Sequence, residues 1–355
     1  MIGAFLLTLL AGFSAAAPLR GPYLVDASST AVRICWRAEK DECAAWNDLV
    51  PDAQFQYTIA ASTRRWTARP LPMAGEALRF AAFGDSGSGR AAQQAVAATL
   101  EAYAPQFVLL AGDLVYPRGA DQGYDARYFE PYAPLLSRIP FFPSPGNHDY
   151  ANAGANREKG ESRFRSAYAK IHRRPRYYAF TVGDARFFSL DTNAPYGVAA
   201  AAPIAKGSPQ WRWLEKELAA SPELWKIALF HVPAYSSGKH GGDERVRAAL
   251  EPLFSKYGVD LAIQGHDHHY ERTAKIKKTV YAVVGTGGAG LRGLKWRDRA
   301  EWSEFALVEH GFLGVELRGG SLKIEFYDEN GQIRDFAEIT KAPRKDRRPR
   351  KSRSP

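Results

Sequence analysis

Five short blocks in this 355-residue chain each place polar side chains directly after an apolar run that is typical of a β-strand. In chain order the blocks are Gly84-Asp85, Gly112–Tyr116, Gly146–Asp149, His231–Pro233 and Gly265–His268. The loops beyond strand ends are where α/β folds collect their chemistry. Together the blocks hold more oxygen and nitrogen donors than one ion requires. They therefore indicate a site for two metal ions, of the kind that hydrolyses phosphate esters.

The carboxylates and the histidines of these blocks have complementary roles. Asp85 and Asp113 follow successive predicted strands, and a cation between them would offset their repulsion. Asp113 is the candidate bridging ligand, because a carboxylate offers two oxygens. In a strand-like stretch residues two apart face the same side, so His266 and His268 are expected to enter one site while Asp267 points away.

Tyr116, in the second block, narrows the choice of metal. A phenol with a pKa near ~10 is a poor ligand for most divalent ions at neutral pH. A hard trivalent ion such as Fe(III) stabilises the phenolate, so Tyr116 favours iron(III) at one position. The second position, with Asn147 and histidine donors, is expected to hold a divalent Fe, Zn or Mn ion.

The apolar runs and the amphipathic segments alternate from Leu78 onward, which predicts an α/β sandwich with sheets inside and helices outside. Strands are predicted near 78–84, 107–112, 139–143, 177–182, 186–190, 225–230, 259–264, 279–284, 305–317 and 322–326. Helices are predicted near 90–103, 126–137, 210–220 and 243–257. Alternating apolar residues at 31–36 and 54–59 predict a separate small β module before a Pro/Gly break at 71–75.

The net charge of +10 comes mainly from the end of the chain. Residues 341–355 contain eight Lys or Arg and one Asp, which gives +7 and leaves about +3 for the rest. Such a tail is expected to be disordered, and we favour a solvated tail over contact with an anionic surface or polyanion. No specific nucleic-acid partner is predicted.

The N-terminal residues 2–17 form an uncharged apolar run that ends in small residues. This is typical of a secretory signal, although no Lys or Arg precedes Arg20, and the run is short for a spanning helix. A secreted or periplasmic protein that does not span the membrane is therefore expected. Cys35 and Cys43 form a disulfide or remain two free thiols, and their spacing does not decide between these. The expected division is a signal peptide at 1–17, a β module at 18–72, a catalytic domain at 76–340 and a basic tail at 341–355.

The blocks resemble those of the metallophosphoesterase (calcineurin-like phosphoesterase) family, and with Tyr116 they resemble purple acid phosphatases in particular. The resemblance covers most of Phe80–Glu271 and includes Tyr177–Phe180, Ser189–Asp191, Gln210–Leu214 and His268–Arg272. Residues 20–23 and 56–59 resemble the fibronectin-type module that precedes the catalytic domain in larger members. The implied fold is a four-layer α/β/β/α sandwich preceded by a short, truncated β module.

The resemblance also implies the ligands and the activity. The implied iron(III) ligands are Asp85, Asp113, Tyr116 and His268. The implied ligands of the divalent metal are Asp113, Asn147, His231 and His266. The implied activity is that of an acid phosphatase, in which a metal-bound hydroxide attacks a phosphate monoester. His148 is expected to bind a phosphate oxygen and assist the leaving group, and His240 to contact substrate, with proton donation as a hypothesis.

The sequence allows more than one role for several other residues and more than one function for the protein. His172, His269 and His310 are expected to be structural or exposed, and Asp149 either orients His148 or caps a turn. A phosphodiesterase or nuclease on the same fold is the main alternative, because the basic tail would aid binding of a polyanion. A non-catalytic secreted binding protein is disfavoured by the complete donor set. The substrate is expected to be a phosphorylated small molecule or a polyanion, and the oligomeric state is not predicted.

Overall fold

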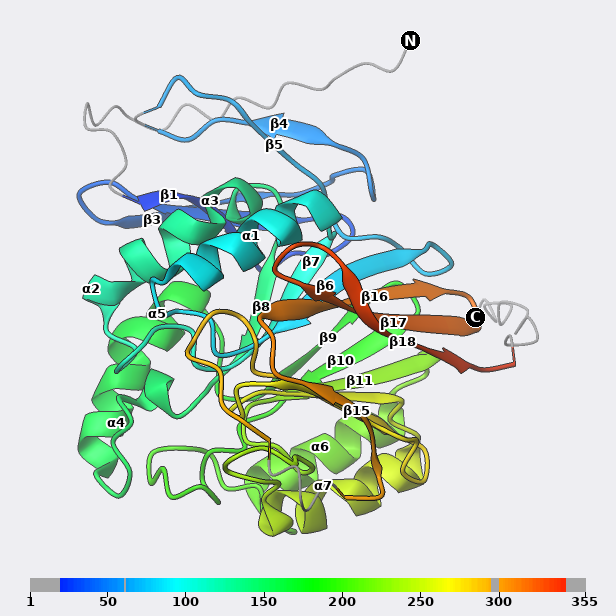
Figure 1. The fold of residues 1–355 in the computed structure, drawn as a ribbon. Helices are drawn as coiled ribbons and strands as arrows, with labels where there is room; N and C mark the ends of the chain where they lie inside the picture. The colour runs from blue at the N-terminus through cyan, green and yellow to red at the C-terminus, as the bar shows by residue number, and fades with distance from the viewer. Residues whose placement is uncertain (1–19, 61, 295–299, 343–355) are drawn as a thin grey trace, which may run out of the picture.

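The structure of this chain is a computed structural model that describes residues 20–60, 62–294 and 300–342 (Figure 1). The predicted signal peptide and nearly all of the predicted basic tail lie outside these residues, so both stay predictions. Within the described ranges, no helix combines the length and the apolar character needed to cross a bilayer.

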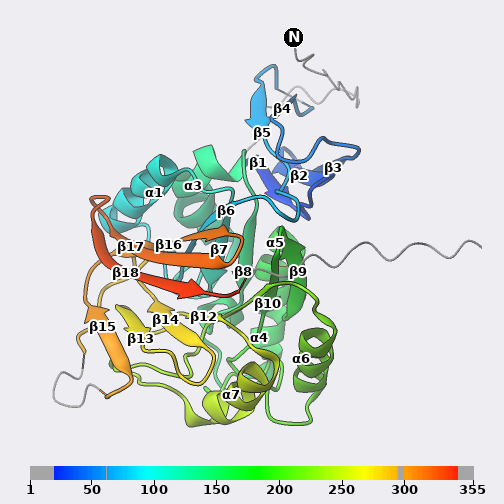
Figure 2. The same ribbon diagram turned by 90° about the vertical axis from the view of Figure 1, so that its right-hand side faces the viewer.

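Two mixed β-sheets face each other in the centre of the molecule (Figures 1 and 2). The six-stranded sheet has the order β18-β17-β16-β6-β7-β8, and the seven-stranded sheet has the order β15-β13-β14-β12-β11-β10-β9. The first sheet consists of β6 (Leu78–Phe83), β7 (Phe107–Ala111), β8 (Phe141–Ser144), β16 (Gly311–Arg318), β17 (Ser321–Asp328) and β18 (Ile333–Thr340). The second consists of β9 (Tyr178–Val182), β10 (Ala185–Ser189), β11 (Trp225–Phe230), β12 (Leu261–Gln264), β13 (Tyr270–Thr273), β14 (Val280–Val284) and β15 (Ser303–Leu307).

Aromatic side chains fill the space between the two sheets. Phe80 on β6 and Phe107 on β7 stack with their ring centroids 4.9 Å apart. Phe187 on β10 packs edge-on against both, at 5.5 Å and 5.4 Å. All three are buried, and burial of each such ring stabilises the fold by roughly 1.5–3 kcal/mol. This core explains why these strands are almost wholly apolar, since each sheet is covered on both faces.

Helices cover the outer face of each sheet. The six-stranded sheet is covered by α1 (Ala91–Tyr103) and by a helical run of α2 (Asp121–Tyr124), the π-helix η1 (Asp125–Phe129) and α3 (Glu130–Leu136). The seven-stranded sheet is covered by α6 (Pro209–Ala220) and α7 (Glu244–Tyr257). Asp243 begins α7 by accepting a hydrogen bond from the amide of Arg245 at 2.8 Å, and Gly258 ends it with a φ of 69°. The four-layer α/β/β/α sandwich is confirmed.

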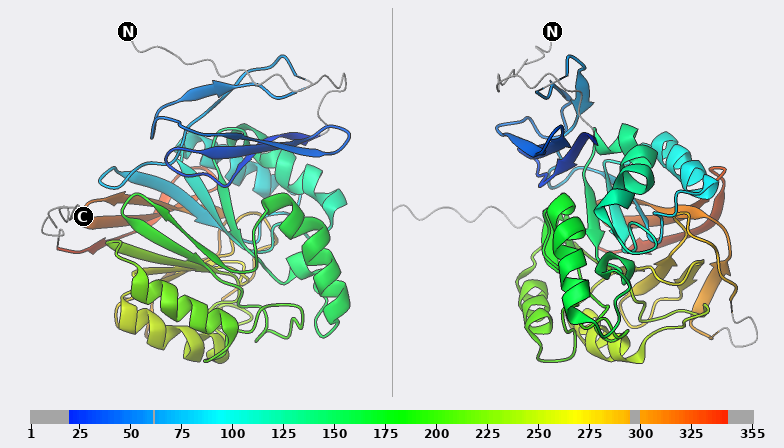
Figure 3. Two further views of the ribbon diagram at one scale, coloured as in Figure 1. Left: turned by 180° about the vertical axis from the view of Figure 1, so that it is seen from behind. Right: turned by 90° about the vertical axis from the view of Figure 1, so that its left-hand side faces the viewer.

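The N-terminal strands form two small sheets at one end of the sandwich (Figure 3). They are β1 (Arg20–Val25), β2 (Val32–Arg37) and β3 (Asp41–Trp46) in one sheet, and β4 (Phe55–Tyr57) and β5 (Trp66–Ala68) in the other. Cys35 and Cys43 lie opposite each other on β2 and β3 and are joined by a disulfide. The Tyr57 hydroxyl donates to the Ser137 carbonyl at 2.7 Å, so these strands pack directly against the helical run. Their status as a separate domain stays a prediction.

The structure refines the predicted elements in two places and adds others. The run 305–317 is two strands, β15 and β16, in different sheets, because the chain passes from the seven-stranded sheet to the six-stranded sheet at residues 308–310. The predicted helix at 126–137 begins as a π-helix. Five further elements were not predicted: β13, β18, α4 (Arg157–Arg163), the π-helix η3 (Phe164–Tyr168) and α5 (Ala169–His172). β18 is an edge strand with mostly exposed or half-buried residues, so its apolar alternation is weak.

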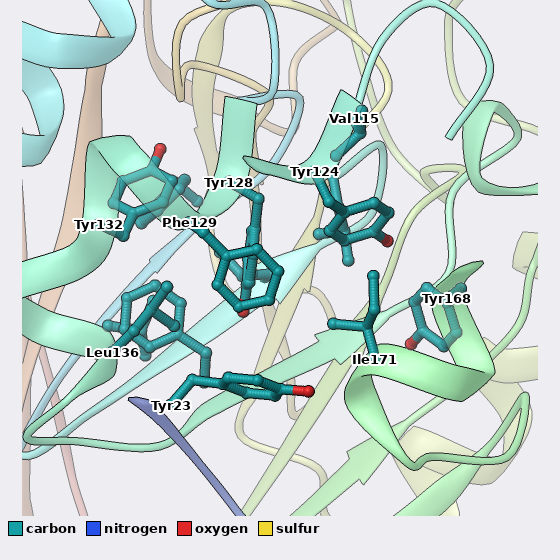
Figure 4. Close-up of a cluster of buried hydrophobic side chains, with 14 of the residues drawn as sticks. Tyr23, Val115, Tyr124, Tyr128, Phe129, Tyr132, Leu136, Tyr168 and Ile171 are labelled. Atoms are coloured by element: carbon teal, nitrogen blue, oxygen red, sulfur yellow. The ribbon is translucent and has the colours of Figure 1, made fainter. Parts of the chain in front are cut away.

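An aromatic cluster rich in tyrosine lies between the helical run and the strands (Figure 4). Tyr124, Tyr128 and Tyr168 surround the buried ring of His172, with ring centroids 5.7, 5.2 and 5.1 Å from it. The Tyr124 hydroxyl lies 3.4 Å from His172 Nε2. His172 is therefore structural, and burial, together with the charge of Arg174, lowers its pKa to about 3.

Acid is expected to destabilise the protein through His172. Its pKa in the folded state lies below the unfolded value of about 6.5, so the unfolded chain binds a proton that the folded chain does not. The free energy of unfolding is unaffected by this group above pH 6.5. Below that pH it falls, by up to about 1.4 kcal/mol per pH unit. Chemical denaturation of the His172→Gln variant between pH 4 and 7 should show a shallower decline than wild type. Tyr124→Phe keeps the imidazole and should keep the wild-type slope; equal slopes in all three proteins would contradict this assignment.

Candidate active site

The five donor blocks meet at one edge of the sandwich because of the strand directions. β6, β7 and β8 are parallel to one another, and so are β11 and β12, so their carboxyl ends lie together. Asp85, Asp113 and Asn147 follow the first three strands, and His231 and His266 follow the other two.

Tight backbone turns aim these side chains into the site. Asp85, Asp113 and His266 have φ angles of 57°, 54° and 71°, in the left-handed region that most side chains avoid. The glycines of the blocks allow close approach, since a Cβ at Gly146 would overlap the Asp113 carboxylate. At each of these residues the left-handed conformation turns the backbone sharply away from the preceding strand. Such strained conformations are common at functional sites.

Four of the predicted donors form one group around the Tyr116 hydroxyl. This oxygen lies 2.9 Å from Asp85 Oδ1, 3.0 Å from Asp113 Oδ2 and 3.1 Å from His268 Nε2. His268 Nε2 is also 3.3 Å from Asp85 Oδ1. Burial and the charges of Asp113 and Asp85 raise the pKa of Tyr116 well above its usual value. These four residues are the set that the family resemblance implies for iron(III).

The other donors form a second group around His231 Nε2. This nitrogen lies 3.0 Å from Asn147 Oδ1, 3.2 Å from His266 Nδ1 and 3.4 Å from Asp113 Oδ2. Asp113 Oδ2 therefore belongs to both groups. The structure brings all seven predicted ligands together, and Asp113 lies where the two groups meet.

Main-chain carbonyls set the orientation of two of the histidine rings. His231 Nδ1 lies 2.7 Å from the Ala111 carbonyl, and His268 Nδ1 lies 2.6 Å from the Gly290 carbonyl. A carbonyl only accepts, so each Nδ1 carries a hydrogen and donates it. In a neutral ring the lone pair is then on Nε2, the nitrogen that faces the other donors and the one suited to bind a metal.

The chemistry of this donor set fits cations. Donor atoms of Asp85, Asp113 and His231 all lie within 4.8 Å of one another, and all three residues are buried. Burial lowers the pKa of His231, but the Asp113 and Asp85 carboxylates outweigh it and raise the value to about 10. Among the described residues, His266 Nε2 is buried without a hydrogen-bond partner. Two buried carboxylates beside an unsatisfied ring nitrogen form a place where positive charge is stabilised.

A cavity of about 220 Å³ opens over the donors. His148 lies in its wall, with Nδ1 2.5 Å from the Pro117 carbonyl and its ring 4.4 Å from that of Tyr116. His240 also lies in the wall, with its ring 4.6 Å from that of His266 and its Nε2 in contact with the Arg292 guanidinium. Both predicted catalytic histidines therefore line the cavity.

Three further residues that were not predicted line this cavity. They are Asn152, Tyr196 and Arg292. The Asn152 side chain accepts a hydrogen bond from Asn147 Nδ2 at 3.2 Å, and the Tyr196 ring lies 4.3 Å from that of His266. None of the three directly follows a predicted strand, so no pattern in the sequence identifies them.

Asp149 holds the backbone of the site and does not contact His148 through its side chain. Its carboxylate accepts hydrogen bonds from the amides of Asp113, Leu114 and Gly146 at 3.1, 3.2 and 2.8 Å. Burial and the neighbouring Asp113 carboxylate raise the pKa of Asp149 to about 8. Of the two expected roles, the structure shows the cap.

Asp267 points away from the donors, as its position between His266 and His268 predicts. It accepts from the His240 amide at 2.9 Å and from the Ser236 hydroxyl at 2.6 Å, so it fixes the loop that carries His240. The next histidine, His269, is buried 3.2 Å from Glu271 and is structural.

Comparison with known proteins agrees with this geometry. Residues 78–270, which are 193 of the 355 residues, match the calcineurin-like phosphoesterase family. Purple acid phosphatase 18 of Arabidopsis thaliana is 31% identical over 223 residues, covering 57% of this chain and 48% of that protein. The uncharacterized protein Rv2577 of Mycobacterium tuberculosis is 29% identical over 266 residues, covering 65% and 50%. The chain thus spans about half the length of these relatives.

The fold also matches a solved structure. Purple acid phosphatase PPD1 from yellow lupin (Lupinus luteus) seeds superposes with a TM-score of 0.74 at 19% identity, covering 91% of this chain and 75% of that one. At this identity the likeness concerns the fold. With the family match across the catalytic blocks, the chain belongs to the calcineurin-like phosphoesterase family and has the fold of the purple acid phosphatases.

Proposed function

We propose that this protein is an acid phosphatase that hydrolyses phosphate monoesters at a centre of iron(III) and a divalent Fe, Zn or Mn ion. The observation that carries the proposal is the arrangement of seven donors in two groups that share Asp113 Oδ2. One group includes the Tyr116 phenol and suits a hard trivalent ion, and the other contains amide and imidazole donors and suits a divalent ion. The family match supports a metal-dependent hydrolase.

The proposed residues would hold both ions at the floor of the cavity. Asp85, Tyr116 and His268 would bind iron(III), Asn147, His231 and His266 would bind the divalent ion, and Asp113 would bind both. The chemistry that such a pair supplies when bound is Lewis-acid polarisation of the phosphate and activation of water. In the reaction an oxygen of water bonds to phosphorus, the ester P–O bond breaks, and the leaving oxygen takes up a proton.

His148 and His240 would act on the substrate from the cavity wall. The Pro117 carbonyl accepts from His148 Nδ1, so Nε2, which lies 3.8 Å from Asp113 Oδ2, faces the donors; in the protonated ring it would contact a phosphate oxygen and assist the leaving group. Arg292 donates to His240 Nε2, which places the proton of the neutral His240 ring on Nδ1. His240 would therefore donate through Nδ1.

We also propose that the protein works in an oxidising compartment. The Cys35–Cys43 disulfide supports this, since disulfides persist in secreted and periplasmic proteins and are rare in the cytosol.

A substrate panel with metal analysis tests the proposed function. Protein purified without added metal should contain two ions per chain, one of them iron, and should hydrolyse p-nitrophenyl phosphate at acidic pH. Activity confined to bis-p-nitrophenyl phosphate would favour a phosphodiesterase or nuclease. A protein that binds two ions and hydrolyses neither ester would overturn the proposal and favour a binding protein.

A further inference from the structure

A second cavity, of about 450 Å³, adjoins the cavity over the donors. His148, His268 and Arg292 line both cavities, so the two meet along these side chains. Tyr116 lies in the wall of the second cavity, with its hydroxyl in the donor group described above. A small ligand bound over the donors therefore lies beside the second cavity.

The second cavity, which we call the arginine cavity, is lined by Arg90, Arg127 and Arg292, and among the described residues no aspartate or glutamate lines it. Arg90 precedes α1, Arg127 belongs to η1 and Arg292 follows β14, so three separate segments bring positive charge to one place. Across the described ranges, no carboxylate forms a salt bridge with any of the three. Nearby Arg20, in contrast, pairs with Asp125 at 2.6 Å.

Two of these guanidinium groups are held in place by neutral partners. Arg127 donates to the Tyr116 carbonyl, and Arg292 donates to His240 Nε2. Neither partner carries a negative charge, so neither arginine is neutralised by the group to which it donates. Arg90 is exposed and lies against Gly290, where a Cβ would come 3.0 Å from its Nη1 atom. A glycine at position 290 therefore leaves room for the Arg90 guanidinium at the edge of the cavity.

The chemistry of this lining selects an anion with several oxygens. A guanidinium presents a planar fork of N–H donors that matches two oxygens of a phosphate, and charged pairs of this type are the stronger hydrogen bonds. A concave surface of uniform positive charge also concentrates anions. A phosphoryl group, with up to two negative charges and three terminal oxygens, fits three arginines better than a neutral group does.

We propose that the arginine cavity binds a second phosphoryl group of the substrate, so that the preferred substrates are small organic bisphosphates. One phosphate lies over the donors and is hydrolysed, while the other lies among Arg90, Arg127 and Arg292. This inference rests on the proposed phosphatase function and adds the substrate class to it.

The test compares matched substrates that differ by one phosphate. We would measure kcat/KM for fructose 1,6-bisphosphate, for fructose 1-phosphate and for fructose 6-phosphate, with p-nitrophenyl phosphate as the measure of phosphatase activity itself. Wild type should favour the bisphosphate roughly tenfold or more over either monophosphate, as expected for one or more charged hydrogen bonds. In Arg90→Gln this ratio should fall about tenfold, mostly through KM, and Arg90→Lys should retain part of it.

Arg118→Gln is the matched control, because Arg118 is exposed, near in sequence and absent from the lining of both cavities. It removes the same charge and should leave the ratio unchanged. Hydrolysis of p-nitrophenyl phosphate with no bisphosphate preference, or a preference that Arg90→Gln does not reduce, would overturn the arginine cavity and leave the proposed function standing. If Arg90→Gln and Arg118→Gln lower the bisphosphate preference equally, the preference depends on net charge alone. That result would also overturn the arginine cavity. Failure to hydrolyse any phosphate ester would instead refute the proposed function.

Discussion

Asp113→Asn is expected to abolish phosphatase activity, with kcat falling roughly a thousandfold or more. Asp113 Oδ2 is the atom common to both donor groups, at 3.0 Å from the Tyr116 hydroxyl and 3.4 Å from His231 Nε2. The amide of asparagine carries no negative charge and offers only one good ligand atom. Both metal positions should therefore lose affinity together, and the metal content should fall from two ions per chain toward zero.

The measurement combines kcat for p-nitrophenyl phosphate with metal analysis of the same sample. Asp48→Asn is a matched control, since Asp48 also has a positive φ, of 57°. It is exposed and belongs to none of the donor blocks. Asparagine tolerates that backbone conformation, so both variants should fold, as circular dichroism can check. Substantial turnover by Asp113→Asn with a full metal content would contradict a shared ligand at this position.

The position of the site could be predicted from the sequence because it depends on strand direction. Parallel strands end at the same edge of a sheet, so donors such as Asp85 and Asp113, each one loop beyond a strand, have to meet. This rule holds here because the apolar runs that precede the donors are clear in the sequence. The rings of His266 and His268 also enter one site, as predicted, but both residues lie in the turn beyond β12, where His266 has a φ of 71°, and not in a strand.

The rest of the cavity could not be predicted, because it depends on contacts between distant segments. Tyr196 and Arg292 reach His266 and His240 from loops whose paths are set by packing and not by a local pattern. The missed strand β18 is similar, since it is recognised by pairing with β17 and not by its own apolar residues. The strand propensity of a segment predicts little where contacts with other segments decide its structure.

The N-terminal strands reach the site indirectly, through η1, which is also a long-range effect. Arg20 on β1 is buried and pairs with Asp125, the first residue of η1, across 105 positions of sequence. Two residues further along η1, Arg127 donates to the Tyr116 carbonyl. The N-terminal strands thus support η1, which follows the second donor block. None of the seven proposed metal ligands lies in these strands.

Tyr116→Phe is expected to remove the colour of the protein. If Tyr116 binds iron(III), the phenolate gives a visible charge-transfer band, and phenylalanine lacks the oxygen that makes it. The hydroxyl lies within 3.1 Å of Asp85, Asp113 and His268, so its loss also removes one of four donors from that group. Iron content should fall, and kcat should fall with it, while the group around His231 keeps its four donors.

Tyr196→Phe provides the matched control, because Tyr196 lines the cavity over the donors but is not one of the proposed ligands. Its ring packs against that of His266, with the ring centroids 4.3 Å apart. It is 40% exposed, so the change costs little packing, and the visible band should persist at its wild-type intensity. The absorption spectrum, iron content and kcat of the two variants can then be compared directly. If wild-type protein is fully active but colourless and free of iron, Tyr116 has another role and both positions hold divalent ions. If instead Tyr116→Phe keeps the band, the phenolate that binds iron belongs to another tyrosine. Loss of the band in Tyr196→Phe would then identify Tyr196 as that residue.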